Sequence, residues 1–149
     1  MDILHINLRT SVKSLLVISF TLGLGLCAKT AFAEPPSVPK DHKGVTVGLL
    51  EELPKETLER TVGLKGYTLR MRWVTVEAGG RIAEHSHADR PGIVSMVDGK
   101  WWEGLYGSDT MFSSDGYQSF PETEKTVHWV YNHSDKPSTA LVCDIVKTK

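Results

Sequence analysis

Short apolar segments separated by turn-forming residues are the feature that most restricts how this chain can fold. Gly, Asp, Ser and Pro interrupt the second half of the sequence at short intervals. Between these interruptions, segments such as 68–77 (TLRMRWVTVE) alternate apolar residues on one face with Arg70 and Arg72 on the other. Strands are expected at 45–49, 68–77, 93–97, 100–105, 126–132 and 139–147. Short strands at this spacing indicate an all-β sandwich or barrel.

The length of the chain and its Pro-rich N-terminal segment predict one folded domain after a linker. The 149 residues are enough for one domain with its own core and too few for two. The segment 34–43 (EPPSVPKDHK) is Pro-rich and charged, which is typical of an extended linker, and 44–149 is the expected domain. Only 51–60 has a helical pattern, and Pro54 limits it to a short helix.

The N-terminal 33 residues have the pattern of a secretory signal peptide. Arg9 and Lys13 precede an uncharged apolar run at 15–28, and 31–33 (AFA) is an A-x-A cleavage signal. The apolar run is short for a membrane span, which needs about 20 apolar residues. We therefore expect 1–33 to be removed and the protein to be periplasmic or secreted, with no membrane attachment afterwards. An uncleaved anchor is the alternative.

The charge of the chain restricts its possible partners, and its cysteine content excludes an internal disulfide after the leader is removed. The net charge is −1 and no basic cluster is evident, so the sequence predicts a small-molecule partner and no nucleic acid. After removal of the leader one cysteine remains, Cys143, and a single cysteine makes no internal disulfide. It lies in an apolar run, 140–143, and we expect it to be a buried strand residue.

Three histidines are spaced as ligands of one metal ion would be. His85 and His87 form an H-x-H pair, and residues i and i+2 of a strand point to the same face. His128 lies on the predicted strand 126–132 and is the candidate third ligand. Because an H-x-H pair also arises by chance on a solvated strand, the spacing alone leaves both interpretations open. His42 and His133 fall in loop-like segments and are expected at the surface.

Two stretches of the chain resemble the paired motifs of the cupin superfamily. The first motif, G-x5-H-x-H-x3,4-E-x6-G, is matched at Gly79, His85, His87 and Gly99. The second, G-x5-P-x-G-x2-H-x3-N, is matched at His128 and Asn132, and loosely at Gly116 and Pro121. The resemblance is to small single-domain bacterial cupins. It implies a jelly-roll β-barrel over 44–149 that holds one divalent metal ion at His85, His87 and His128.

The sequence departs from the first motif at the position of its acidic ligand. Gly92 stands where the motif has Glu. A site of three histidines resembles that of the Fe(II)-dependent thiol and diketone-cleaving dioxygenases, whereas cupins that oxidise oxalate with Mn usually keep the Glu. The resemblance therefore favours Fe(II), with Mn, Ni or Zn as alternatives. The nearby acids considered as replacements for the missing ligand are Glu84, Asp89 and Glu124.

Candidate substrate contacts come from aromatic and basic residues near the motifs. Arg72 is suited to bind a substrate carboxylate in the mouth of the barrel. Aromatic side chains offer apolar walls, although such residues more often pack in cores. The candidates are Arg72, Trp102, Tyr106 and Trp129. No catalytic residue is assigned, and Glu103 and Tyr106 are only guesses for a general base.

These features predict an exported metal-binding cupin, in the first place a mononuclear non-haem oxidoreductase resembling a dioxygenase and acting on a small organic substrate. Three alternatives stay open: a non-catalytic metal or small-molecule binding module, a cupin isomerase or lyase acting on a small acid or sugar, and a metal-free barrel that uses a histidine as base. By analogy with cupins, the edge 45–49 is a candidate for pairing in a homodimer.

Overall fold

The structure is a computed structural model in which residues 37–148 are described. The signal peptide predicted at 1–33 and the first residues of the linker lie outside the described residues. Among the described residues, no helix is long and apolar enough to cross a membrane.

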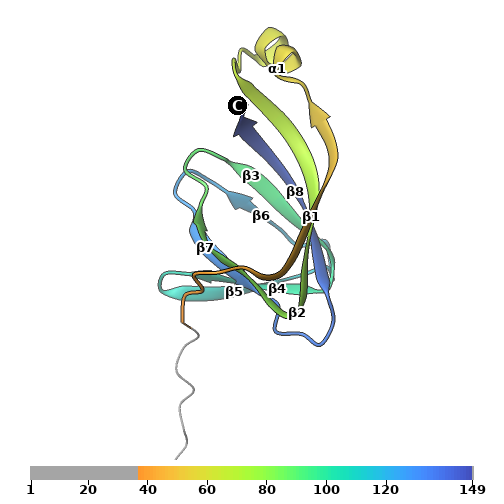
Figure 1. Ribbon diagram of the computed structural model, residues 1–149, viewed down its shortest axis with the longest axis vertical. Helices are drawn as coiled ribbons and strands as arrows, with labels where there is room; N and C mark the ends of the chain where they lie inside the picture. Colours follow the sequence, from red (N-terminus) through yellow and green to blue (C-terminus); the bar gives the residue numbers. More distant parts are fainter. Residues whose placement is uncertain (1–36, 149) are drawn as a thin grey trace, which may run out of the picture. The chain divides into compact units, whose positions relative to one another are not determined.

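The described residues form eight antiparallel strands and one short helix, which confirms the all-β prediction (Figure 1). The strands follow one another as β1 (Lys43–Leu53), β2 (Tyr67–Ser86), β3 (Gly92–Asp98), β4 (Lys100–Leu105), β5 (Ser108–Ser113), β6 (Ser119–Glu122), β7 (Val127–Tyr131) and β8 (Ser138–Lys147). The helix α1 (Lys55–Val62) connects β1 and β2. Neighbouring strands follow the order β5-β4-β7-β2-β8-β3-β6, with β1 on β2, and make a nearly closed jelly-roll barrel.

The long strand β2 belongs to both halves of the barrel. Its first part pairs with β8 over 67–76, and its last part pairs with β7 over 81–86. Strand β2 continues through 78–80 and bends there. Gly79 has φ +64, and a side chain on Gly80 would meet the backbone oxygen of Glu77 at 2.8 Å. Two glycines therefore bend β2 and bring its end, with His85, beside β7.

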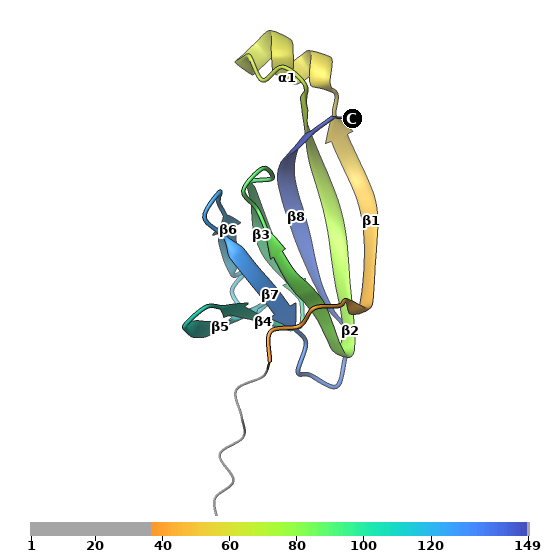
Figure 2. The ribbon, with the colours of Figure 1, turned by 60° about the vertical axis from the view of Figure 1, so that its left-hand side comes forward.

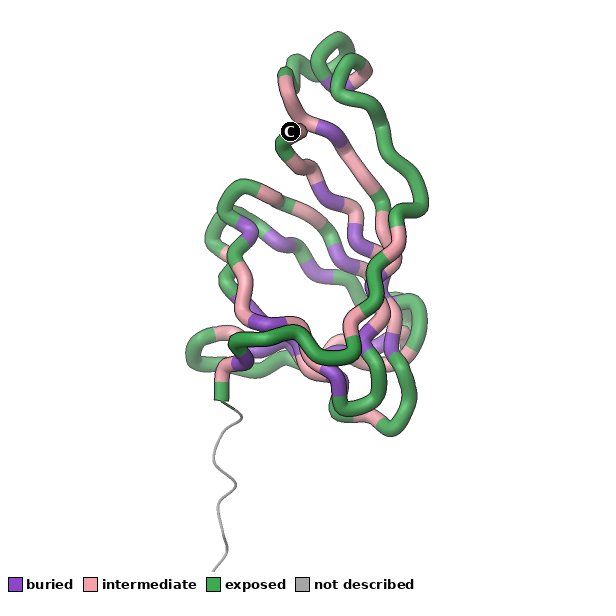
Figure 3. The backbone as a smooth tube through the Cα atoms, viewed as in Figure 1, coloured by how far each residue is buried: buried purple, intermediate pink, exposed green. Residues whose placement is uncertain are grey.

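The core lies between the two halves of the sheet, as the buried stretches of the strands show (Figure 3). Its buried side chains are Val74, Val76, Val94, Met96, Trp101, Phe120, Val130, Ala140 and Val142. Val74 and Val76 share a face of β2 with Arg70 and Arg72. The arginine face of this strand is therefore the interior face. The sequence predicted the alternation correctly, but it did not predict which face is turned inward.

Other boundaries differ from those expected. Strands β5 and β6 were not predicted, and β1 continues to Leu53, where it pairs with Leu69 of β2. The helix consequently begins later than expected and ends at Val62, and Gly63, with a φ of 74, is its C-cap. Cys143 lies on β8 as predicted, but it is half-buried rather than buried.

Strand β1 lies at the edge of the β2–β8–β3 sheet (Figure 2). Among the described strands it pairs only with β2, and several of its apolar side chains, Leu49 among them, are exposed. The predicted homodimer through 45–49 stays a prediction.

Candidate metal centre

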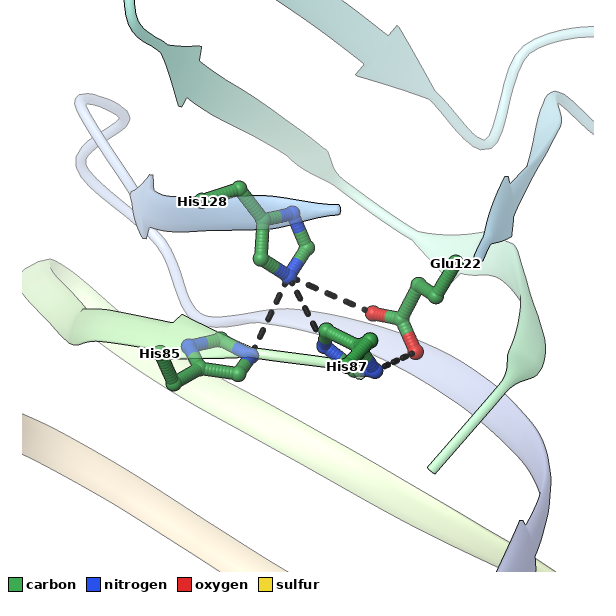
Figure 4. A group of neighbouring side chains, drawn as sticks. All are labelled: His85, His87, Glu122 and His128. Carbon is green, nitrogen blue, oxygen red and sulfur yellow. Dashed lines mark hydrogen bonds and ion pairs between the residues drawn. The ribbon is translucent and has the colours of Figure 1, made fainter. Parts of the chain in front are cut away.

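Three histidine rings meet at one point inside the barrel (Figure 4). His85 lies near the end of β2, His87 directly follows that strand, and His128 lies on β7 as the Cα partner of His85. The Nε2 atom of His128 is 3.1 Å from Nε2 of His85 and 3.1 Å from Nε2 of His87. The H-x-H spacing and the antiparallel register of β2 and β7 produce this convergence.

The other nitrogen of each ring has a hydrogen-bond acceptor. Nδ1 of His85 donates to the carbonyl oxygen of Ala83 at 2.8 Å, and Nδ1 of His87 donates to that of Arg90 at 3.0 Å. Nδ1 of His128 donates to Oε1 of Glu103 at 2.5 Å. These partners place each ring proton on Nδ1 and leave lone pairs on the three converging Nε2 atoms. Facing lone pairs repel one another, so this arrangement fits a cation held between them.

Glu122 brings a carboxylate to the same cluster. It is buried at the end of β6, with Oε1 3.5 Å from Nε2 of His128 and Oε2 3.2 Å from Nδ1 of His87. Oε2 has no hydrogen-bond partner among the described residues, because the Nδ1 proton of His87 is directed at Arg90. One ligand atom from each of the four residues lies within 4.8 Å of the others. The donor set therefore fits a divalent metal ion.

Burial sets the protonation of the cluster. It lowers the pKa of His85 and of His87 to about 4, so both rings are neutral at neutral pH and available as ligands. Burial also raises the pKa of Glu122 to about 7, because the charged carboxylate is desolvated. A bound cation would favour the charged form of this carboxylate.

The presence of Glu122 corrects the expectation of a site that lacks a carboxylate. Its Cα is the register partner of Gly92, the position where the motif has its acid. A Cβ atom at Gly92 would lie 2.9 Å from the carbonyl oxygen of Cys143 and 3.1 Å from Cβ of Asp144. Position 92 therefore has no room for a side chain, and the neighbouring strand supplies the acid instead.

The acids considered from the sequence lie elsewhere. Glu84 forms an ion pair with Lys40 at 3.3 Å and accepts a hydrogen bond from Tyr106, and Asp89 and Glu124 are exposed. The one sequence signal for Glu122 was its place two residues after Phe120, which shares the inward face of β6.

Glu103 and Tyr106 were the guesses for a general base, and neither lines the cavity beside the histidines. Glu103 is buried on β4 and contacts the ring of His128 on the side away from the cluster. It therefore orients His128 and fixes the position of its ring proton. Tyr106 is exposed and packs against Trp129.

A cavity of about 530 Å³ adjoins the histidines, a size typical of small-molecule sites. Its lining is His42, Val45, Val47, Arg72, Val74, Ile82, His85, His87, Arg90, Trp101, Glu122, His128, Val130 and Val142. Arg72 thus lies where a substrate contact was expected. His42, although exposed as predicted, also borders the cavity and accepts a hydrogen bond from the backbone N–H of Ala83.

The three aromatic candidates do not line this cavity. Trp102 faces away from it and packs against His133, because Trp101, its neighbour on β4, takes the inward position. Trp129 is likewise one residue from His128 on β7 and covers Gly104, where a Cβ atom would meet its ring nitrogen at 1.9 Å. Trp101 is the aromatic residue of the cavity, and the sequence did not single it out from Trp102.

Comparison with known proteins supports the fold. No family model matches the chain, and no curated protein matches its sequence. Among solved structures, it resembles a cupin-2 domain from Rhodospirillum rubrum with 14% identity and a TM-score of 0.55, covering 78% of this chain and 68% of that one. It also resembles the Cupin_2 domain of an XRE family transcriptional regulator from Enterobacter cloacae, with 17% identity, a TM-score of 0.51, and coverage of 72% and 100%.

KdgF from a Halomonas species is similar to the same degree, with 16% identity, a TM-score of 0.52, and coverage of 73% of this chain and 87% of that one. These likenesses establish a shared fold at low sequence identity. The described part of the chain therefore has the cupin fold, as the sequence motifs predicted, and it carries a candidate metal site of three histidines and one glutamate.

Proposed function

We propose that this chain is an exported, metal-dependent oxidoreductase that binds one divalent ion through His85, His87, His128 and Glu122 and acts on a small organic substrate. The observation that carries the proposal is the convergence of three Nε2 lone pairs and a buried carboxylate beside a cavity. The export follows from the leader pattern at 1–33.

The donor set bears on the identity of the ion. Three imidazoles and one carboxylate suit Fe(II), Mn, Ni or Zn. An acid in the site restores Mn as a candidate, because the cupins that oxidise oxalate with Mn usually keep one. The same acid removes the likeness to a site of three histidines alone, so Fe(II) and Mn are tested side by side. Such an ion supplies Lewis acidity and, in the case of iron or manganese, a redox centre.

The residues of the chain have separate tasks in this proposal. The neutral rings of His85 and His87 act as ligands without first losing a proton. Glu103 holds His128 in the orientation that directs Nε2 at the cluster. Val74, Trp101 and the other apolar walls limit the access of water to the substrate. The adjoining cavity favours an enzyme over a metal-storage module, because storage requires no space for an organic ligand.

Elemental analysis of protein purified without chelator tests the ligand set. We expect about one equivalent of iron or another first-row divalent ion in the wild type and a negligible amount in His85→Ala/His128→Ala. His133→Ala is the matched control, since this histidine is exposed and packs on Tyr131 and Trp102 outside the cluster. Equal, negligible metal in the wild type and the double variant would refute the metal site. Oxygen uptake by iron-loaded protein on small acids, thiols and diketones then tests the reaction.

Replacing Glu103 with glutamine is expected to weaken Zn²⁺ binding about 10- to 100-fold. The amide keeps the size of the side chain but removes the charge that strengthens Nδ1 donation from His128 and the basicity of its Nε2. Competition with a chromophoric chelator measures the affinity. Glu84→Gln is the control, because Glu84 lies on β2 beside His85 but pairs with Lys40. Unchanged affinity in Glu103→Gln would show that this contact does not tune the site.

A further inference from the structure

Three arginines gather around one buried carboxylate at the wall of the cavity. Arg72 and Arg90 line the same cavity as the histidines, and Arg70 lies two residues before Arg72 on β2. One carboxylate, that of Asp144 on β8, is within salt-bridge distance of all three guanidinium groups. Its side chain is fully buried. Within salt-bridge distance, three positive charges therefore meet one negative charge, while Glu122 and Glu52 interact with Arg90 and Arg70 from farther away.

The hydrogen bonds of Asp144 are divided unequally among the three arginines. Arg70 binds both carboxylate oxygens, with Nε 2.8 Å from Oδ1 and Nη2 3.2 Å from Oδ2. Arg72 donates through Nη2 alone, at 2.8 Å to Oδ2. The Nε atom of Arg90 is 3.8 Å from Oδ2, beyond hydrogen-bond distance. Arg70 thus binds Asp144 through two nitrogens, whereas Arg72 does so through one and Arg90 through none.

Arg72 keeps unused donors inside the protein. A guanidinium group has five N–H donors, and the described residues provide an acceptor for one nitrogen of Arg72. Its Nε is buried without any partner among them. The Nη1 atom also has no acceptor among the described residues but, unlike Nε, is not closed to solvent, so an anion in the cavity can supply one. Burial also lowers the pKa of Arg72, and Asp144 only partly offsets that effect.

Apart from the arginines, the histidines and Glu122, the lining of the cavity is apolar. It consists of Val45, Val47, Val74, Ile82, Trp101, Val130 and Val142. Such walls favour hydrocarbon over a highly hydrated ligand. An inorganic anion would satisfy the arginines but leave this surface without a partner.

We propose that the cavity takes a small organic acid whose carboxylate is bound by Arg72 and Arg90 and whose apolar body lies against the valines and Trp101. The cavity volume of about 530 Å³ admits a ligand of this class. This assignment of a substrate class rests on the proposed function for its catalytic meaning, because the acid would then lie beside the metal ligands. The binding of the acid by arginine is separable from the metal and is tested without it.

Calorimetric titration of chelated, metal-free protein tests the proposal with two matched pairs of probes, hexanoate with hexanamide and benzoate with benzamide. Each amide keeps the shape of its acid but lacks the charge. We expect at least one acid to bind about tenfold or more tightly than its amide. Inorganic phosphate is the fifth probe, and we expect it to bind more weakly than the acids.

Two variants separate direct binding from an indirect effect through Asp144. Arg72→Gln is expected to weaken acid binding about tenfold or more, because Arg72 lines the cavity. Arg70→Gln is the control: Arg70 also binds Asp144 but does not line the cavity, so acid binding should be retained. Thermal unfolding of both variants verifies that they are folded. Zn²⁺ affinity should be unchanged in Arg72→Gln, which distinguishes loss of the anion site from loss of the metal site.

Three results would overturn the proposal. The first is equal binding of acids and amides, or no binding of either at up to about 10 mM. The second is equal loss of acid binding in Arg72→Gln and Arg70→Gln, which would assign the effect to the Asp144 cluster. The third is tighter binding of phosphate than of any acid, which would identify an inorganic anion as the ligand. A wild-type protein that contains no metal but binds the acid through Arg72 would refute the proposed function and leave this inference standing.

Discussion

Metal-free protein, prepared with a chelator, is expected to lose folding stability as the pH falls from about 6.5 towards about 4. Burial holds the pKa of His85 and of His87 at about 4, below the ordinary 6.5. Between these values the unfolded chain binds a proton at each histidine and the folded protein does not. Lower pH therefore favours the unfolded chain, and this part of the stability is fully present only above pH 6.5.

Glu122 acts in the opposite direction. Burial raises its pKa from 4.5 to about 7, so below pH 7 the folded protein holds a proton that the unfolded chain releases down to about pH 4.5. Between pH 6.5 and 4.5, unfolding adds one proton to each of the two histidines and releases one from Glu122. The unfolded chain therefore binds one proton more than the folded protein. The free energy of unfolding should therefore fall by at most about 1.4 kcal/mol per pH unit.

Urea unfolding of chelated protein at a series of pH values measures this slope, and Glu122→Gln sharpens the test. The amide does not titrate, so the opposing contribution is lost and the slope should approach about 2.7 kcal/mol per pH unit. His133→Gln, which replaces an exposed ring outside the cluster, should keep the wild-type slope. Identical slopes in the wild type and Glu122→Gln would contradict the assignment of a buried, proton-binding carboxyl group.

Replacing Asp144 with asparagine is expected to lower the free energy of unfolding by about 3–5 kcal/mol. The buried carboxylate is the acceptor for Arg70 and Arg72 and lies 3.8 Å from Arg90. The amide removes the negative charge and leaves three positive groups in one place. The midpoint and slope of urea unfolding at pH 7.5 measure the loss.

Two further variants identify the cause of that loss. Asp41→Asn breaks an ion pair with Arg81 at 2.8 Å that is largely exposed, and it should change the stability little. The double variant Asp144→Asn/Arg72→Gln should regain part of the stability lost in Asp144→Asn, because one of the unbalanced charges is removed. A small loss in Asp144→Asn, comparable to that in Asp41→Asn, would show that the cluster is solvated rather than buried.

The features that the sequence predicted well depend on local geometry. The H-x-H spacing places two rings on one face wherever the backbone is extended, and the strand around His128 has the same period. Alternation in the same way separated Arg72 from Trp73 on β2. Alternation does not show which face of a strand is turned towards the core. For this reason the sequence pointed to Trp102 on β4, whereas Trp101 is the inward residue.

The features that the sequence did not reveal depend on pairing between distant strands. Glu122 lies on a strand of four residues, too short for a periodic pattern, and reaches the histidines because β6 pairs with β3. Asp144 meets Arg70 and Arg72 because β8 pairs with β2 in a register that makes Arg70 its Cα partner. Neither register follows from the spacing of residues along the chain.

The register of Gly92 with Glu122 also links the two ends of the cavity through β8. The acid of the site comes from β6, and the space beside position 92 is filled by β8. A side chain introduced at Gly92 would press against the carbonyl oxygen of Cys143 and against Cβ of Asp144, an atom that every residue but glycine has. Strand β8 would have to shift to admit it, and Asp144 would then move relative to Arg70 and Arg72. The packing at the ion-binding end therefore constrains the ion pairs at the arginine end.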